Sequence, residues 1–190
     1  DVCSSDLGEL VIAAEDRNFR SHGGVDWLAV AGSIRAGLTG RKARGASTIT
    51  MQLAAYIAPE LARPGSRSLR QKARQIRAAL DIEDNWSKDR ILEAYLNMAG
   101  WRGEAQGIAA ASRQLFAKPP SALSRDEAAL LTALLPDPQT PPEQVAKRAC
   151  RIAGGHCAEM AALAGQALNG ARRAADDPDL APHLARRLID

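Results

Sequence analysis

The sequence predicts an all-α fold. The 190-residue chain is 46% hydrophobic but only 4% aromatic, and its apolar side chains recur at helical spacing with few β-branched runs. This length is enough for one domain with a sizeable core. The net charge of +3 is mild, so it is compatible with an anionic partner without identifying one.

The predicted helices follow one another closely. The first covers residues 7–17 and contains Glu15. Gly23 and Gly24 then end this helix. Asp26 suits the N-cap of a helix from Trp27 to about Leu38, because its carboxylate can accept hydrogen bonds from the free amides of the first turn. Further helices are expected over residues 47–57, 68–83, 88–99, 108–116, 124–135, 143–153 and 157–175. Ser87 can cap one of these, and Ser124 and Glu127 form a capping box at another.

The helix over residues 68–83 has faces of different character. At about 100° per residue, one stripe is apolar and is expected to face the core: Leu69, Ala73, Ile76 and Leu80. Arg70, Arg74 and Arg77 share one flank; a solvated face is the ordinary role of such a stripe, and nucleic-acid binding is disfavoured because aromatic residues are not interleaved. Lys72 lies on the other flank with Ser68, Gln75 and Ala79, where it is expected to hold phosphate as a point charge.

The three cysteines indicate neither a zinc site nor a disulfide framework, because their number is odd and no C-x-x-C pair occurs. Cys150 and Cys157 could pair in an oxidising compartment, but we expect small buried hydrophobic residues. No window holds eighteen consecutive apolar residues, so this sequence contains no predicted membrane span.

Glu15 is the candidate general base. It follows the apolar run 10–14 at the end of a helix, and it is expected to face a cleft. Burial against Phe19 and the like charge of Asp16 would both raise its pKa toward the range where a carboxylate can accept a proton at neutral pH. The alternative is the common one for an acidic pair, a solvated helix end.

Five sequence blocks occur in series: EDRNFRSHGGVD, GASTITMQLA, RSLRQKARQIRAALDIE, KDRILEAYLN and GIAAASRQLFAKPPSALSRDEAALLTALLPDP. From about Leu10 to Pro138 the chain resembles the peptidoglycan glycosyltransferase domain, glycosyltransferase family 51, of monofunctional transglycosylases and class A penicillin-binding proteins. The resemblance implies a lysozyme-like, two-lobed helical domain with a long substrate cleft. It implies a glycosyltransferase core over 8–140 and C-terminal helices with a linker-like tail over 141–190. Residues 1–7 do not resemble the family's lead-in and are expected to be a non-native or disordered leader.

The resemblance also implies a reaction. Lipid II would be polymerised into β-1,4 glycan strands with inversion and release of polyprenyl diphosphate. Glu15 matches the catalytic glutamate, a general base for the acceptor hydroxyl, and Asp16 is expected to orient it or to cap locally. A departing diphosphate needs cations rather than a second acid, and Arg67 and Lys72 match the family's basic residues near it. The predicted substrate-binding residues are Asp16, Ser47, Gln52, Arg67, Lys72 and Gln75. A divalent cation, Mg or Mn, could share the charge, but no clustered carboxylates are present to hold one, so no metal ligand is predicted.

Four residues depart from the family pattern. Met51 replaces the first of two glutamines, and Gln52 keeps the second. Gln75 stands where most members have a second glutamate, and Gly32 and Ala55 stand where many have a basic residue that faces the donor. Losing two cations should weaken donor binding unless Arg35, Lys42 or a metal compensates. The alternative function is therefore a catalytically weakened scaffold of the same fold that binds lipid II or glycan. A lysozyme-like hydrolase would need a second acid near Glu15, and Gln75 argues against it.

The implied partners are lipid II, the growing glycan strand and the outer leaflet of the bacterial cytoplasmic membrane, with other cell-wall synthesis proteins as further candidates and no nucleic acid. Within 28–38 the apolar residues expected to meet the leaflet are Leu28, Val30, Ile34 and Leu38, although an ordinary core face gives the same spacing. The implied location is the periplasmic face of that membrane. The family's anchor helix ahead of the first block is absent from this sequence, as are the Ser-x-x-Lys and Lys-Thr-Gly motifs of a transpeptidase domain.

Overall fold

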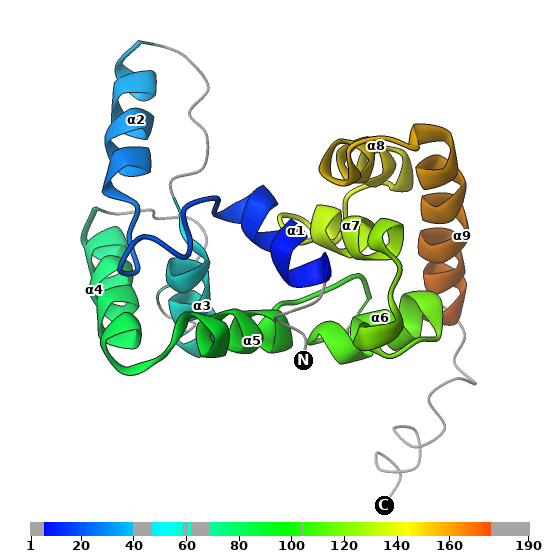
Figure 1. The fold of residues 1–190 in the computed structure, drawn as a ribbon, viewed down its shortest axis with the longest axis horizontal. Coiled ribbons are helices and arrows are strands. Elements are labelled where there is room, and N and C mark those ends of the chain that lie inside the picture. The colour runs from blue at the N-terminus through cyan, green and yellow to red at the C-terminus, as the bar shows by residue number, and fades with distance from the viewer. Residues whose placement is uncertain (1–5, 40–46, 59–60, 62–68, 104, 176–190) are drawn as a thin grey trace, which may run out of the picture. The chain divides into compact units, whose positions relative to one another are not determined.

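The computed structural model describes residues 6–39, 47–58, 61, 69–103 and 105–175 (Figure 1). Within these ranges the regular elements are helices, together with one isolated bridge between Gly100 and Gln106. The predicted all-α fold is therefore confirmed. The chain divides into two compact units, Asp1–Ala99 and Gly100–Asp190, in agreement with the expectation of two lobes. The predicted long cleft stays a prediction.

The first unit contains five helices among its described residues: α1 (Asp6–Glu15), α2 (Trp27–Leu38), α3 (Ile49–Ile57), α4 (Leu69–Asn85) and α5 (Lys88–Met98). Helix α3 is central and packs against both α4 and α5. The largest fully buried side chains in this unit come from α1, α3, α5 and the α1–α2 connection: Leu7, Phe19, Ile49, Met51, Leu53, Ile91, Leu92, Tyr95 and Leu96.

Short polar side chains begin several helices as predicted. The carboxylate of Asp26 accepts from the amide of Ala29 at 2.9 Å, and Ser87 accepts from Arg90. Thr48 caps α3 by accepting from the amide of Met51. Each of these contacts satisfies an amide that has no partner inside its own helix, so the helix starts are encoded locally.

The predicted core stripe of α4 is only partly correct, because, of its members, Ile76 packs against the core but two others are exposed. Ala73 is exposed and Leu80 is 37% exposed, whereas Ala79, placed on the flank by the sequence pattern, is fully buried. Ala79 belongs to a small core cluster with Val25 and Met51, against which Val30 and Ile76 pack. The physical reason is a close approach of backbone: a Cβ atom on Gly24 would lie 2.9 Å from the carbonyl oxygen of Ala79. A small residue of α4 is needed there, so Ala79 is buried while Leu80 is partly exposed. The exposed positions of Arg70, Arg74 and Arg77 agree with the predicted arginine flank.

The second unit contains α6 (Ile108–Phe116), the short 3₁₀ helix η3 (Pro120–Ala122), α7 (Arg125–Leu134), α8 (Pro142–Ala153) and α9 (Cys157–Ala175). Helix α7 is buried along most of its length, from Glu127 to Leu134. Helix α8 packs on α7 and α9, and α9 also contacts α6. The capping box between Ser124 and Glu127 is present as predicted. Because α8 packs closely on α7, the predicted boundary between the core and residues 141–190 is not visible as a gap in packing and stays a prediction.

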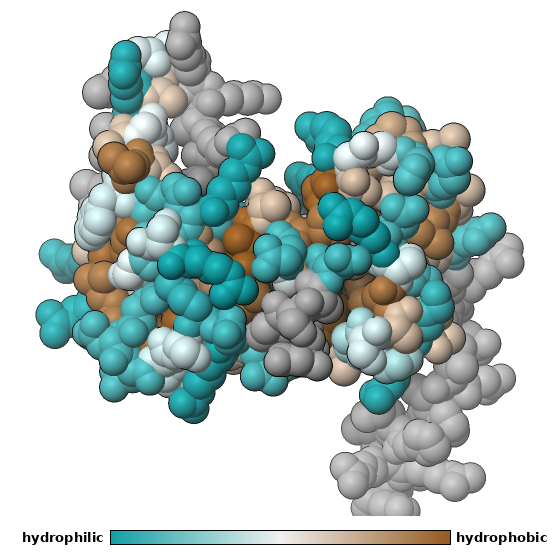
Figure 2. Space-filling view, viewed as in Figure 1, coloured by the Kyte–Doolittle hydropathy of each residue, from teal (hydrophilic) through white to brown (hydrophobic). Residues whose placement is uncertain are grey.

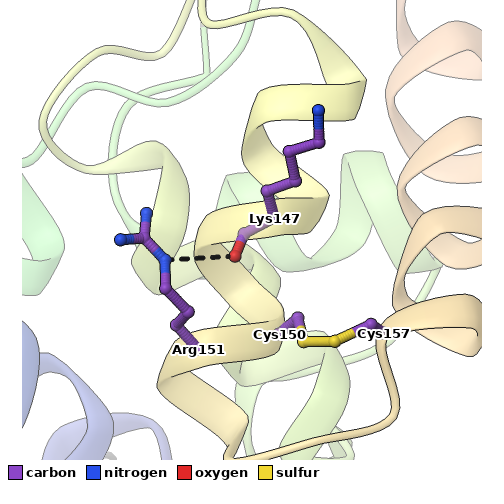
Figure 3. Close-up of a disulfide and its surroundings, with 4 residues drawn as sticks. All are labelled: Lys147, Cys150, Arg151 and Cys157. Atoms are coloured by element: carbon purple, nitrogen blue, oxygen red, sulfur yellow. Dashed lines mark hydrogen bonds between the residues drawn. A yellow bond between two sulfur atoms is a disulfide. The ribbon is translucent and has the colours of Figure 1, made fainter.

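Cys150 and Cys157 form a disulfide between the end of α8 and the start of α9 (Figure 3). The expectation of two buried free thiols is therefore wrong, and the alternative, pairing, is correct. Helix α8 ends at Gly154, whose positive φ of 84° reverses the chain. This turn brings the two Cα atoms to 5.0 Å, within the range that a disulfide bridges.

Some expectations fall on residues outside the described ranges. They include residues 1–5 of the predicted leader, Lys42, Arg67 and the linker-like tail after residue 175. Among the helices that the structure describes, none has the length and apolar character needed to cross a membrane.

Candidate active site

Glu15 is the last residue of α1 and is partly buried. Its position follows from the packing of that helix, because Leu7, Leu10, Val11 and Ile12 are buried. The carboxylate accepts a hydrogen bond from the Nε2 of Gln52 on α3, with a distance of 3.2 Å to Oε2. The structure thus brings together two predicted site residues that are 37 positions apart.

Gln52 is held in turn by Tyr95 on α5. The hydroxyl of Tyr95 donates to Oε1 of Gln52 at 3.1 Å, and the ring of Tyr95 stacks on Tyr56 with centroids 5.8 Å apart. Burial raises the pKa of Tyr95 well above its usual value, and the negative charge of Glu15 raises it further. The pKa of Tyr56 is raised for the same two reasons. Both hydroxyls therefore stay protonated at neutral pH. The sequence analysis did not assign Tyr95 to the site and missed its contact with Gln52.

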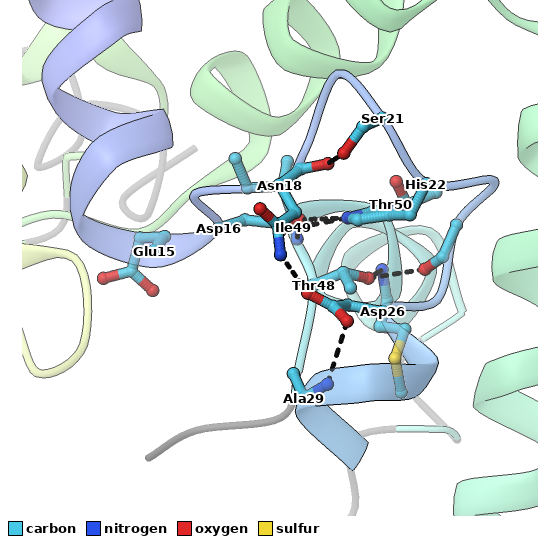
Figure 4. A network of polar contacts seen from close by, with 12 residues as sticks. Glu15, Asp16, Asn18, Ser21, His22, Asp26, Ala29, Thr48, Ile49 and Thr50 are labelled. Atoms are coloured by element: carbon cyan, nitrogen blue, oxygen red, sulfur yellow. Dashed lines mark hydrogen bonds and ion pairs between the residues drawn. The ribbon is translucent and has the colours of Figure 1, made fainter. Parts of the chain in front are cut away.

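Asp16 lies in a separate network that joins the start of α3 to the α1–α2 connection (Figure 4). Its buried carboxylate accepts from the amide of Ile49 at 3.0 Å, and both of its oxygens lie 3.0 Å from Nε2 of His22. Thr48 extends this network by donating its hydroxyl to the carbonyl of Gly24 at 2.6 Å. These contacts match the expected local capping role of Asp16. Its predicted contact with substrate stays a prediction. In Figure 4 the carboxylate of Glu15 points away from this network.

An ion pair between Lys88 and Glu83 lies next to this network. Lys88 on α5 contacts Glu83 on α4 at 2.7 Å, and it donates to the carbonyl of His22 at 2.6 Å. The hydroxyl of Thr50 donates to the same carboxylate of Glu83 at 2.6 Å. The ammonium of Lys88 also lies 4.6 Å from the centre of the Phe19 ring. This group ties α3, α4 and α5 to the α1–α2 connection. This group could not be predicted from the sequence, because isolated charges on amphipathic helices usually face solvent.

Lys72, Ser47 and Gln75 meet on the other side of the α3 start. The ammonium of Lys72 donates to Oγ of Ser47 at 3.0 Å and to Oε1 of Gln75 at 3.1 Å. The amide of Gln75 donates to the carbonyl of Met51 at 2.8 Å. Glu15 therefore contacts Gln52 of α3, and Lys72 is linked through Gln75 to Met51, the residue just before Gln52. The predicted base and the predicted phosphate-binding cation thus contact neighbouring positions of one helix. Arg67, the other predicted cation, lies outside the described residues.

The departures Gly32 and Ala55 lie on different helices. Gly32 is exposed on α2, and a Cβ atom added there would meet nothing within 4 Å. It lines a pocket of about 660 Å³, and the other described lining residues are Arg35, Ala36 and Thr39. Arg35 is exposed, so a positive charge borders the pocket although position 32 carries no side chain. Ala55 on α3 is partly buried.

A resident metal ion does not fit the described residues. Among them no three histidine, cysteine, aspartate or glutamate side chains are grouped so that they could hold one. The carboxylate of Asp16 contacts His22, and that of Glu83 contacts Thr50 and Lys88. No chemical step at this site is therefore assigned to a metal.

The chain is similar to known proteins over most of its length. A family model described as transglycosylase matches residues 1–156, which extends past the predicted core at both ends. The chain is 41% identical over 141 residues to a biosynthetic peptidoglycan transglycosylase of Rhodospirillum centenum, and the match covers 73% of this chain and 58% of the relative. It is 43% identical over 128 residues to the protein of the same name from Mannheimia succiniciproducens, with 67% and 51% covered.

A longer relative matches a smaller share of its own length. Penicillin-binding protein 1A of Mycobacterium tuberculosis is 40% identical over 132 residues, which cover 70% of this chain and 16% of the relative. The chain spans about half the length of the transglycosylases that it matches.

Proposed function

Because the chain belongs to the transglycosylase family, we propose that it is a peptidoglycan glycosyltransferase that polymerises lipid II into β-1,4 glycan strands. One observation carries the proposal: the carboxylate of Glu15 and the ammonium of Lys72 are both linked by hydrogen bonds to the start of α3. Glu15 accepts from Gln52, and Lys72 donates to Gln75, which in turn donates to the carbonyl of Met51. A proton acceptor and a phosphate-binding cation are the two groups that this reaction requires.

Glu15 acts as the general base. The 4-hydroxyl of the acceptor GlcNAc attacks the anomeric carbon of the donor MurNAc, and its proton passes to the carboxylate of Glu15 as the new bond forms. The bond to the diphosphate breaks at the same centre, and its electron pair leaves with the polyprenyl diphosphate. Attack from the face opposite the leaving group converts the α linkage to β. A hydroxyl is a weak nucleophile at neutral pH, so removal of its proton in the transition state accelerates the reaction.

Lys72 stabilises the departing diphosphate. Its ammonium is partly buried and is oriented by Ser47 and Gln75, so it does not need to be reorganised when negative charge develops. Arg67 is a second cation in the proposal by family resemblance. Arg35 borders the pocket at Gly32 and is the described residue that can replace the positive charge missing from position 32. A second carboxylic acid is unnecessary because diphosphate is a stable anion.

A scaffold that binds lipid II or glycan without polymerising it is the second candidate. Its support is the neutral Gln75 beside Lys72 and the absence of a side chain at Gly32. In this case the same residues would hold the diphosphate, but the transition state would receive too little positive charge.

The proposed place of action is the outer leaflet of the cytoplasmic membrane, where lipid II is presented. Trp27 is 59% and Leu28 is 84% exposed at the start of α2, and Figure 2 shows hydrophobic residues among polar ones on the visible surface of α2. Aromatic and aliphatic side chains of this kind insert into the interface of a bilayer. A Trp27→Ser/Leu28→Ser variant should float less with vesicles that carry lipid II, and unchanged flotation would count against this orientation.

Incubation with lipid II tests the proposed function. The wild-type chain should convert it into glycan strands that a β-1,4-specific muramidase degrades, and parallel reactions with EDTA, Mg²⁺ or Mn²⁺ would show whether a divalent cation contributes. Binding of lipid II without strand growth would select the scaffold. If neither binding nor growth is observed, both functions are wrong.

A further inference from the structure

The contact between Gln52 and Glu15 is one half of a longer chain of hydrogen bonds. Tyr95 donates to Oε1 of Gln52, and Nε2 of Gln52 donates to Glu15. The three residues come from α5, α3 and α1, which are separated by up to 80 positions in the sequence. This series of hydrogen bonds ends at the carboxylate of Glu15, which the proposed reaction uses as its base.

The two contacts of Gln52 fix the orientation of its amide group. If the amide were rotated by half a turn, its carbonyl oxygen would face the carboxylate of Glu15, and two acceptors would be left without a proton between them. The carboxylate of Glu15 can only accept, so it selects the orientation with the NH₂ group toward it, and the hydroxyl of Tyr95 anchors the opposite, carbonyl end by donating to it. Gln52 is thereby held at both ends, by Glu15 and by Tyr95.

The hydroxyl of Tyr95 is well suited to such a role. The side chain is fully buried, and Tyr56 stacks on its ring, so the hydroxyl has little freedom to move. Its raised pKa, caused first by burial and then by the charge of Glu15, keeps the proton in place. A buried hydroxyl without a partner would be destabilising. The hydroxyl of Tyr95 donates to Gln52 and also interacts with the hydroxyl of Tyr56.

We propose that Tyr95 is a positioning residue that acts through Gln52 to hold the carboxylate of Glu15 in one orientation. The inference rests on the proposed function for its effect on rate, whereas its structural part concerns the side chain of Gln52 alone. The carboxylate must lie within hydrogen-bond reach of the acceptor hydroxyl when the bond forms, so loss of its fixed orientation lowers the rate of the chemical step and leaves the binding of lipid II largely intact.

A double-mutant cycle with Tyr95→Phe and Gln52→Ala tests the inference. Tyr95→Phe removes one hydroxyl and keeps the ring that packs on Tyr56. We expect its maximal rate of glycan formation to fall about tenfold, the equivalent of one hydrogen bond, while the lipid II concentration at half-maximal rate changes less than about twofold. In the Gln52→Ala background the same substitution should cause no further loss, because its route of action is already removed.

Three results would overturn the inference. An unchanged rate in Tyr95→Phe would show that the hydroxyl is not needed, and a tenfold loss that persists in the Gln52→Ala background would show that Tyr95 acts by another route. The third concerns the amide itself: in wild-type protein the side-chain NH₂ of Gln52 should give NMR signals of an ordered group, and Tyr95→Phe should disorder them. Unchanged order would contradict the proposal even if the wild type makes no glycan, an outcome that would defeat the proposed function separately.

A folding defect can be recognised and bypassed. The melting temperature of Tyr95→Phe reports any general destabilisation. If it falls strongly, Gln52→Met, which removes the amide and keeps a side chain of similar length, should show the same loss of maximal rate with an intact Tyr95. A fully active Gln52→Met would then contradict the proposal.

Discussion

The backbone of Gly24 lies directly against the carbonyl oxygen of Ala79, at a distance where a Cβ atom on residue 24 would approach to 2.9 Å. This contact joins the α1–α2 connection to α4. The carbonyl of Gly24 also accepts the hydroxyl of Thr48, which caps α3. A single glycine therefore sets the distance between the segment that carries the Asp16 network and two of the helices that surround it.

Gly24→Ala should destabilise the protein substantially. The residue has a φ of +88°, which is unfavourable for any side chain, and the added methyl group would collide with main-chain atoms of α4. We expect a loss of more than about 1 kcal/mol in the free energy of unfolding, measured by urea denaturation. Gly23→Ala is the matched control, because nothing lies within 4 Å of its added Cβ atom. Equal stability of the two variants would contradict the close approach.

The ion pair between Lys118 and Glu127 should make stability depend on pH. Burial alone would raise the pKa of Glu127, but the hydrogen bond from Lys118 and the amide of Ser124 lower it below its ordinary value of 4.5. A lowered carboxylate pKa stabilises the fold above the unfolded-state value, and this stability is lost as the pH falls through the folded-state value. Glu127→Gln keeps an acceptor for the cap, so its unfolding free energy should decrease less between pH 7 and pH 3 than that of the wild type. Parallel pH curves for the two proteins would show that the charge does not matter.

The disulfide should stabilise the second unit. It closes a short loop, because Cys150 and Cys157 are separated by seven positions in the sequence. The entropy that such a cross-link removes from the unfolded chain predicts a stabilisation of about 2 kcal/mol. In a Cys3→Ser background, which removes the third thiol, reductant should lower the melting temperature. A variant that also carries Cys150→Ser and Cys157→Ser should melt, with or without reductant, at the temperature at which the Cys3→Ser protein melts in reductant. If reductant has no effect on the first protein, the cysteines are not paired in solution.

Lys72→Ala should lower the rate of glycan formation about ten- to a hundredfold, because the developing diphosphate charge would lose a pre-oriented cation. Lys72→Arg keeps the charge but not the compact contacts with Ser47 and Gln75, so we expect an intermediate rate. Lys147→Ala is a suitable control, since Lys147 is exposed and pairs only with the adjacent helical turn through Glu143. Initial rates at saturating lipid II would distinguish these cases. Equal rates for Lys72→Ala and Lys147→Ala would remove Lys72 from the mechanism.

Local signals in the sequence predicted much of the fold. The caps at Asp26 and Ser124 were recognisable because each depends on contacts within four residues. Helix α9 begins and ends as predicted. The buried face of α4 could not be predicted, because the approach of Gly24 to Ala79 depends on residues 55 positions apart.

The candidate site was predicted as a set of residues but not as an arrangement. The five blocks identified Glu15, Gln52 and Lys72, and the structure shows which groups contact them. The group formed by Glu83 and Lys88 was missed because neither residue differs in sequence from an ordinary surface charge. Tyr95 was missed because a tyrosine at a core position gives no sign of where its hydroxyl points.

The most direct test of the whole account compares Glu15→Gln with Glu9→Gln in the polymerisation of lipid II. Both substitutions lie on α1 and remove one negative charge, but Glu9 is exposed and its ion pair with Arg20 is long, at 3.7 Å. Glu15→Gln should still bind lipid II and melt near the wild-type temperature, yet form glycan at least about a hundredfold more slowly because no base accepts the acceptor proton. Glu9→Gln should polymerise at the wild-type rate. Strand growth by Glu15→Gln at a rate close to that of Glu9→Gln would contradict the assignment of Glu15 as the base.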